Sequence, residues 1–405
     1  MSKRGYASRT GAGLAILGLF FFSALKADSL FGVNCTFQAD PEEFLGRESR
    51  ARSDIFERTR KFSFARAAAD QRRTVAPAAI PRANFIDVHI FDKLAAQGVE
   101  SAPLSTDAEF LRRVYLDLTG RIPSADEARA FLADSSEDKR RALIDRLLYS
   151  PEFNDKWTMW LGDLLGNTQN STNFSRQYQG RNSMHQWMRA VIAENRPLKD
   201  IVYEAVVARG NNYDGNAGAV NFLLGGVSNG PIQDTFDLMM VKTASTFLGM
   251  GHYDCIVCHD GRRHLDQLSL WGKDAIRLDA YRMAAFFSRL RRIGNNDRES
   301  PYFNSNHVYD LTTGTYDLNT SFGNRPNRVP IGALRNLTPE YHFTKRAPAN
   351  ADWRGQFGDF LTQDRMLARN FANRLWKEMF NLALVEPVDG LDPARLDPKN
   401  PPPAP

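Results

Sequence analysis

Apolar residues recur every three to four positions over most of the chain between residues 84 and 292. This spacing is typical of amphipathic helices that bury one face. The expected helices span residues 84–98, 106–120, 124–132, 136–149, 151–164, 182–194, 198–208, 234–248 and 274–292. Short connections between most of them predict a mainly α fold, a multi-helix bundle.

Polar residues mark where several of these helices should begin. Asn84 is a suitable N-cap for the first helix. Thr106 with Glu109, and Ser124 with Glu127, have the Ser/Thr-x-x-Glu spacing of a capping box. Gly120 is expected to end the helix that begins after Thr106.

The helical pattern breaks in three places. Residues 167–181 are rich in Asn, Ser and Gln, and residues 210–218 in Gly and Asn, so both are expected to be loops. From residue 294 to about 345 the pattern predicts an irregular insertion, with a small β-hairpin over residues 308–318. The helical pattern returns only at residues 363–381, and a Pro-rich tail follows over residues 392–405.

The N-terminus has the pattern of a signal peptide. Lys3, Arg4 and Arg9 precede an apolar run over residues 11–25, and Ala27 offers a small residue for cleavage. We therefore expect residues 1–27 to be a signal peptide and the protein to be exported, to the periplasm or cell surface. The alternative is an uncleaved anchor, although the run is shorter than the roughly 20 apolar residues of a membrane span. This segment is the only expected membrane contact.

The charge is unevenly distributed. The sequence pI is about 9.0, but from residue 84 onward 38 Lys and Arg face 39 Asp and Glu. The excess of positive charge lies in the signal and in a basic Arg/Ala-rich arm over residues 28–83. Because the expected folded part is neutral, we expect no nucleic-acid partner. The arm is expected to be a solvated linker, or a strip that touches an acidic surface or anionic lipid.

The strongest chemical signal is a Cys-x-x-Cys-His motif formed by Cys255, Cys258 and His259. This spacing attaches a c-type haem: the two thiols form thioether bonds and the histidine is the proximal iron ligand. The sequence does not identify the sixth ligand, for which there are several candidates. These are Met250, Met283, His264 and His252.

The same residues allow two other interpretations. Cys255 and Cys258 could form a disulfide in an oxidising compartment, or one of them could pair with Cys35. A metal site would use both cysteines with His259 or His264, and a carboxylate from Asp254 or Asp260.

Other features near the motif and upstream of it carry weaker signals. Arg262 and Arg263 could pair with haem propionates, although a solvated position is the simpler expectation. The glycine-rich run over residues 225–230 lacks the following Lys of a phosphate-binding loop and predicts only a flexible turn. The sequence contains no Walker-type or zinc-protease motif.

Several segments resemble one known family. Residues 111–123, Leu-Arg-Arg-Val-Tyr-Leu-Asp-Leu-Thr-Gly-Arg-Ile-Pro, resemble the most characteristic stretch of domain of unknown function 1549, an exported, planctomycete-cytochrome-associated family. Residues 150–157 and 194–197 look like the same domain, which we expect over residues 84–292. The family's cysteine motif usually continues as Cys-His-Asp-His. This chain departs at Gly261, and the next histidine is His264.

A second resemblance concerns the C-terminal part. Residues 369–376 and 384–389 resemble the opening of domain of unknown function 1553, which usually follows the first domain. We therefore expect residues 293–350 to be an irregular connection and residues 351–391 to be the start of that second domain. Neither resemblance brings an established activity.

The combined expectation is an exported, c-type cytochrome-like protein that transfers electrons to a redox partner or within a larger exported assembly. The alternative is a non-catalytic structural or polymer-binding protein, with a disulfide or metal at the cysteines. A hydrolase whose chemistry lies in a longer C-terminal portion is a third possibility. The sequence predicts neither a substrate nor an oligomeric state.

Overall fold

The computed structural model describes Glu57 and residues 74–171, 173–266, 268–323, 325–342 and 345–395. The expected signal peptide, most of the basic arm with Cys35, and most of the tail lie outside the described residues. Within the described part of the chain, no helix has both the length and the apolar character needed to cross a bilayer.

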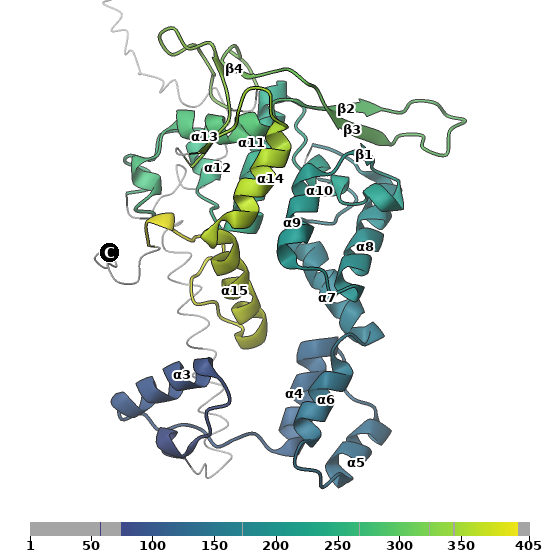
Figure 1. The fold of residues 1–405 in the computed structure, drawn as a ribbon, viewed down its shortest axis with the longest axis vertical. Helices are drawn as coiled ribbons and strands as arrows, with labels where there is room; N and C mark the ends of the chain where they lie inside the picture. The colour runs from purple at the N-terminus through teal and green to yellow at the C-terminus, as the bar shows by residue number, and fades with distance from the viewer. Residues whose placement is uncertain are drawn as a thin grey trace, which may run out of the picture.

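The described residues form a mainly α structure, as the hydrophobic pattern predicts (Figure 1). The helices are α3 (Phe85–Ala96), α4 (Asp107–Thr119), α5 (Ala125–Ala133), α6 (Lys139–Leu147), α7 (Pro151–Leu165), α8 (Gln177–Ala193), α9 (Leu198–Val207), α10 (Val220–Leu224), α11 (Ile232–Thr243), α12 (Tyr253–Ile256), α13 (Arg277–Ala284), α14 (Trp353–Gln363) and α15 (Arg365–Phe380). A π-helical turn, Ala244–Leu248, continues α11.

The predicted helix starts are confirmed by their caps. The side chains of Asn84, Thr106 and Ser124 each accept a hydrogen bond from the backbone of the first turn, and an acidic side chain three residues later bonds back. Gly120 follows α4 with a φ of 68°, a left-handed conformation that glycine adopts without strain. Local sequence therefore determines these boundaries.

Two of the predicted helix boundaries are wrong. Helix α8 begins at Gln177, inside the segment 167–181 that was expected to be a loop. Helix α13 ends at Ala284 rather than near residue 292, and the chain passes through a 3-10 turn into strand β2 (Leu290–Gly294). The apolar residues after Ala284 still face the core, but backbone pairing with a distant strand replaces the helix.

The strands form three small antiparallel sheets. Besides β2 they are β1 (Gly210–Asn211), β3 (Asn306–Asp310), β4 (Tyr316–Asp317), β5 (Asn336–Leu337), β6 (Glu340–Tyr341) and β7 (Lys345–Arg346). Strand β3 lies between β1 and β2, with Val308 opposite both Gly210 and Arg292. Strand β4 pairs with β5. The expected small β insertion is present, but the predicted hairpin over residues 308–318 is wrong because its two halves pair with other strands.

The C-terminal part contains two helices where the sequence predicted one. Helices α14 and α15 meet at Asp364, whose side chain accepts a hydrogen bond from Met366 N at 2.8 Å and caps α15. Helix α14 packs against α9 and contributes Trp353, Phe357 and Leu361 to the core. The segment 351–391 therefore belongs to the main body.

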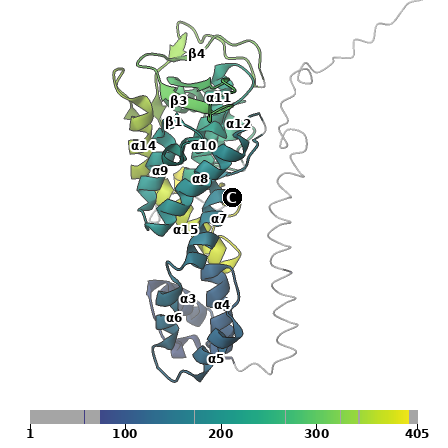
Figure 2. The same cartoon turned by 90° about the vertical axis from the view of Figure 1, so that its right-hand side faces the viewer.

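In the part of the chain that the structure describes, most buried apolar residues form two clusters. The larger one runs through α7 to α15 and the sheets, and it surrounds α12. The smaller one joins α4, α5 and α6 through Leu111, Tyr115, Phe131, Leu143 and Leu147. In Figure 2 this small helical unit lies at one end of the molecule, beyond α7. The Cys-x-x-Cys-His segment lies in the large body, between α11 and α13.

Candidate functional site

The Cys-x-x-Cys-His motif forms one continuous helical turn. The backbone N–H groups of Cys258 and His259 both donate to the carbonyl oxygen of Cys255, at 3.0 Å and 3.1 Å. Residues three and four apart share one face of a helix, so both thiols and the imidazole are neighbours on that face.

The opposite face of the turn holds it in the core. Tyr253, Ile256 and Val257 are fully buried, whereas Cys255, Cys258 and His259 are half-buried. Both cysteines are thiols in this structure. The three motif side chains thus lie on the partly exposed face of a turn whose other face packs in the core.

The hydrogen bond of His259 determines which of its nitrogens is available. Its Nδ1 lies 3.0 Å from the carbonyl oxygen of Asp260. A carbonyl oxygen only accepts, so Nδ1 carries the proton in the neutral ring and Nε2 keeps its lone pair. This second interaction commonly orients metal-binding histidines. The carboxylate of Asp260 in turn accepts a hydrogen bond from Arg277 N at 2.8 Å, which fixes the residue.

His264 lies beside His259 rather than opposite it. The two ring centroids are 3.9 Å apart, with planes inclined by 33°. Imidazoles on opposite faces of one metal ion have centres about 6 Å apart, because each metal–nitrogen bond is about 2 Å long. Burial, and then the neighbouring His259, lower the pKa of His264. In this arrangement His264 covers one side of the His259 ring and does not lie opposite it across a metal ion.

The other three candidates for the sixth ligand are held by neighbours other than His259. Met250 is buried and its backbone bridges to Gly390. Met283 is also buried, and its sulfur accepts a hydrogen bond from His342 N at 3.4 Å. His252 is half-buried, and burial lowers its pKa. The structure groups His264 with the motif and leaves these three in their own packing environments.

Arg325 brings a positive charge to the motif. Its Nη1 lies 3.4 Å from Cys258 Sγ and its Nη2 lies 3.3 Å from Asp254 Oδ1. Burial raises the pKa of the Cys258 thiol, and the guanidinium of Arg325 opposes that rise. Sequence reasoning missed Arg325, because an arginine in a Gly/Asn/Pro-rich segment looks solvent-exposed. Arg262 and Arg263, which were the expected cationic residues, are exposed.

A buried ionic network holds the Arg325 segment in place. Arg328 Nη2 lies 2.6 Å from both Asp234 Oδ1 and Asp237 Oδ2 of α11, and all three side chains are fully buried. Tyr316 joins them through bonds to Asp237 (2.9 Å) and Arg328 Nε (2.7 Å). Burial lowers the pKa of Arg328, but the carboxylate of Asp237 outweighs it and keeps the pKa above its usual value. The network therefore links the β insertion to the helix before the motif.

The residues proposed for a protein-only metal site are not gathered as that site requires. In the described ranges, no three His, Cys, Asp or Glu side chains are placed to hold one ion. A closed structural zinc site needs four such ligands.

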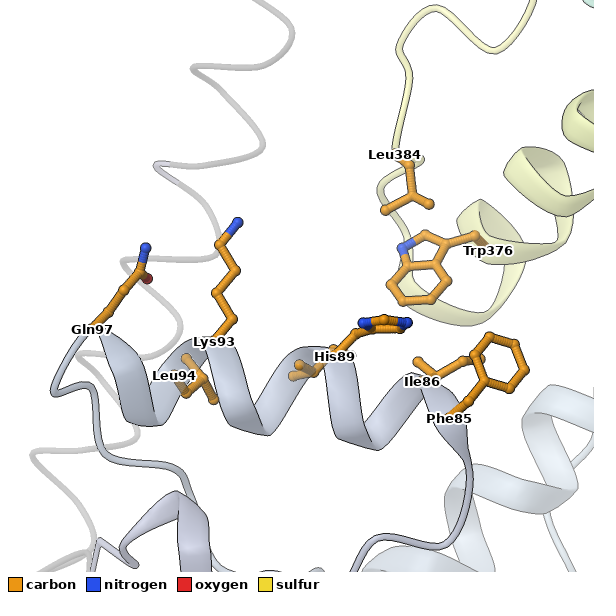
Figure 3. A pocket seen from close by; sticks show the side chains of 9 residues that line it. Phe85, Ile86, His89, Lys93, Leu94, Gln97, Trp376 and Leu384 are labelled. Atoms are coloured by element: carbon orange, nitrogen blue, oxygen red, sulfur yellow. The ribbon is translucent and has the colours of Figure 1, made fainter. Parts of the chain in front are cut away.

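A separate groove lies between α3 and the C-terminal end of α15 (Figure 3). It has a volume of about 580 Å³ and is lined by Phe85, Ile86, His89, Ile90, Lys93, Leu94, Gln97, Trp376 and Leu384. Figure 3 shows the Trp376 ring above His89. The groove contains none of the candidate cofactor or metal ligands, and its mostly apolar lining suits an apolar group.

Comparison with known proteins gives one family. The family model described as PSCyt2, protein of unknown function (DUF1549), matches residues 85–292 of this chain. The matched range includes the Cys-x-x-Cys-His turn and ends before Arg325. No curated protein and no solved structure gave a match.

Proposed function

The chain belongs to the PSCyt2 family of proteins of unknown function, DUF1549, and we propose that it is an exported electron carrier of the c-type cytochrome class. Cys255 and Cys258 would hold the haem through thioether bonds, and His259 Nε2 would bind its iron. A c-type haem, when bound, supplies a one-electron ferric–ferrous couple.

The observation that carries this proposal is the helical turn with its hydrogen-bonded imidazole. Both thiols and the imidazole share one half-exposed face, and Nδ1 of His259 is bonded to a carbonyl oxygen, which leaves Nε2 for a metal. A disulfide needs only the two sulfurs and gives no reason for the orientation of His259. The donor set therefore fits a haem, and the buried face of the turn would keep the donors in place.

The surrounding residues have roles that follow from their positions. Arg325 lies against the Cys258 sulfur with its side chain only 10% exposed, so it would place a positive charge beside the thioether of Cys258. His264 would shield one face of His259 from water. Met250, Met283 and His252 stay candidates for the sixth ligand, together with His264 if its ring moves. Electrons would pass to a redox partner or within a larger exported assembly.

The alternative is a non-catalytic structural or polymer-binding protein in which Cys255 and Cys258 form a disulfide. The specific observation in its favour is that two thiols three residues apart share one helical turn. Such a disulfide would close a very short loop and add little stability by loop-closure entropy. We therefore rank it second.

The two functions are separated by one optical experiment. The full chain is exported in a host with a haem-attachment system and then extracted with acidic acetone, which removes haem that is not covalently bound. The proposal predicts a Soret band that remains with the protein, shifts on reduction with dithionite and is lost in Cys255→Ser. The matched control is Cys35→Ser, which keeps the band. A colourless wild-type protein whose two thiols are oxidised would support the alternative.

A further inference from the structure

Two cationic side chains, the buried Arg176 and the half-buried Lys242, converge on Gly225 in the turn that follows α10. Arg176, the residue before α8, is 1% exposed. A Cβ atom added to Gly225 would lie 2.3 Å from Arg176 Nη2 and 2.4 Å from Lys242 Nζ. The two nitrogens therefore lie less than about 5 Å apart, and they approach the backbone this closely because residue 225 has no side chain.

Both cations are anchored, but their anchors are neutral. Arg176 Nη1 donates to the carbonyl oxygens of Gly166 (2.9 Å) and Thr168 (2.6 Å). Lys242 Nζ donates to Phe222 O at 2.9 Å and lies 4.4 Å from the centre of the Phe222 ring. Carbonyl oxygens and an aromatic face orient a positive charge without neutralising it.

No described carboxylate forms an ion pair with either cation. Burial lowers the pKa of Arg176 to about 10. Burial, followed by repulsion from Arg176, lowers the pKa of Lys242 well below its usual value. Neighbouring like charges in a low-dielectric interior destabilise each other. The protein keeps both cations in this position although nothing in its described part compensates them.

The unused donors of Arg176 form the edge that recognises oxyanions. Nη1 is occupied by two carbonyl oxygens, whereas Nε is buried without an acceptor and Nη2 faces Gly225 beside Lys242. The Nε–Nη2 edge of a guanidinium donates two parallel hydrogen bonds to a phosphate, sulfate or carboxylate. Lys242 is half-buried, whereas Arg176 is fully buried.

We infer that Arg176 and Lys242, at the Gly225 turn, form a binding site for a tetrahedral oxyanion, a phosphate or sulfate group. The anion would accept hydrogen bonds from Arg176 Nε and Nη2 and from Lys242 Nζ, and its negative charge would compensate both cations. The site is independent of the proposed haem attachment, because none of its residues belongs to the Cys255–His259 turn. The sequence pattern did not predict this site, because its lysine does not follow the glycine-rich run 225–230 but belongs to α11.

Binding to the purified full chain tests this inference. The probes are sodium phosphate, sodium sulfate, glycerol phosphate and, at matched ionic strength, sodium chloride. We expect saturable binding at one site by calorimetry and a rise in Tm with the tetrahedral anions but not with chloride. Tighter binding of the inorganic ions would indicate a free ion as ligand, and tighter binding of glycerol phosphate would indicate an oxyanion carried on a larger molecule. Because sulfate and phosphate also raise Tm without binding, calorimetry is decisive, and the absence of saturable binding of phosphate and sulfate would overturn the inference.

Two variants locate the site. Gly225→Ala keeps every charge but places a methyl group where both nitrogens lie, and Lys242→Met removes one cation. Each should weaken phosphate binding at least tenfold. Gly294→Ala is the matched control, because a Cβ atom there would meet nothing within 4 Å, and it should bind as the wild type does. Wild-type affinity in a folded Gly225→Ala protein would rule out this location. The salt selectivity of the unmodified chain tests the inference even if a variant fails to fold.

Discussion

Arg325 donates a hydrogen bond from Nη1 to the sulfur of Cys258, at 3.4 Å. The two residues come from different parts of the chain, since Cys258 lies within the family-matched range 85–292 and Arg325 lies beyond it. The C-terminal part of this chain therefore contributes directly to the environment of the cysteine motif.

Replacement of Arg325 should change the reactivity of Cys258. In Arg325→Met the thiolate loses its nearby cation, so the pKa of Cys258, already raised by burial, should rise further. Alkylation by iodoacetamide of haem-free protein, in a background without Cys35 and Cys255, should become severalfold slower below that pKa, because only the thiolate reacts. The control is Arg335→Met, at an exposed arginine of the same insertion. An unchanged or faster rate in Arg325→Met would contradict the assignment.

The buried network at Arg328 should be essential for stability. Arg328→Met removes the guanidinium to which the buried Asp234 and Asp237 both bond, and breaking a buried pair in this way costs about 3–5 kcal/mol. The expected result is a large drop in Tm. Arg129→Ala removes an exposed pair with Asp126, which is worth at most about 1 kcal/mol, and serves as the control. Similar Tm values for the two variants would show that the network is dispensable.

His264 should titrate below the usual histidine range. Its pKa is lowered in the folded protein, first by burial and then by His259. The unfolded chain therefore binds the proton more readily than the folded protein does. As the pH falls from about 6.5 through the lowered pKa, the free energy of unfolding decreases, because protonation of His264 favours the unfolded chain. NMR titration of the imidazole measures the pKa directly. His259→Asn should raise it, whereas His185→Asn, at an exposed position on α8, should leave it unchanged.

The sequence predicts those parts of the fold that local interactions determine. The helix starts after Asn84, Thr106 and Ser124 follow from side chains that cap the adjacent turn. The end of α13 could not be predicted, because the apolar spacing continues through Phe286 and Phe287 although the backbone turns to pair β2 with β3. Strand pairing depends on residues distant in sequence.

The same distinction applies to the candidate site. The motif lies within five consecutive positions, so its spacing alone predicts that Cys255, Cys258 and His259 share one helical face. Arg325 contacts the cysteine motif, and Arg328 contacts two acidic residues of α11. In both cases the partners lie more than 60 positions away in the sequence, and the burial of each arginine depends on them. No periodicity marks an arginine whose partners are brought to it only by the fold.

Peptide mapping of the exported protein tests the account most directly. The full chain is produced with a haem-attachment system, digested with a protease and measured by mass spectrometry. We predict that the peptide containing Cys255 to His259 carries the mass of one haem, and that Cys258→Ser abolishes this two-thioether attachment while Cys35→Ser retains it. Two results would contradict the account in protein that was exported with an active haem-attachment system. One is a peptide of unmodified mass, and the other is a peptide lighter by two hydrogens, which indicates a Cys255–Cys258 disulfide.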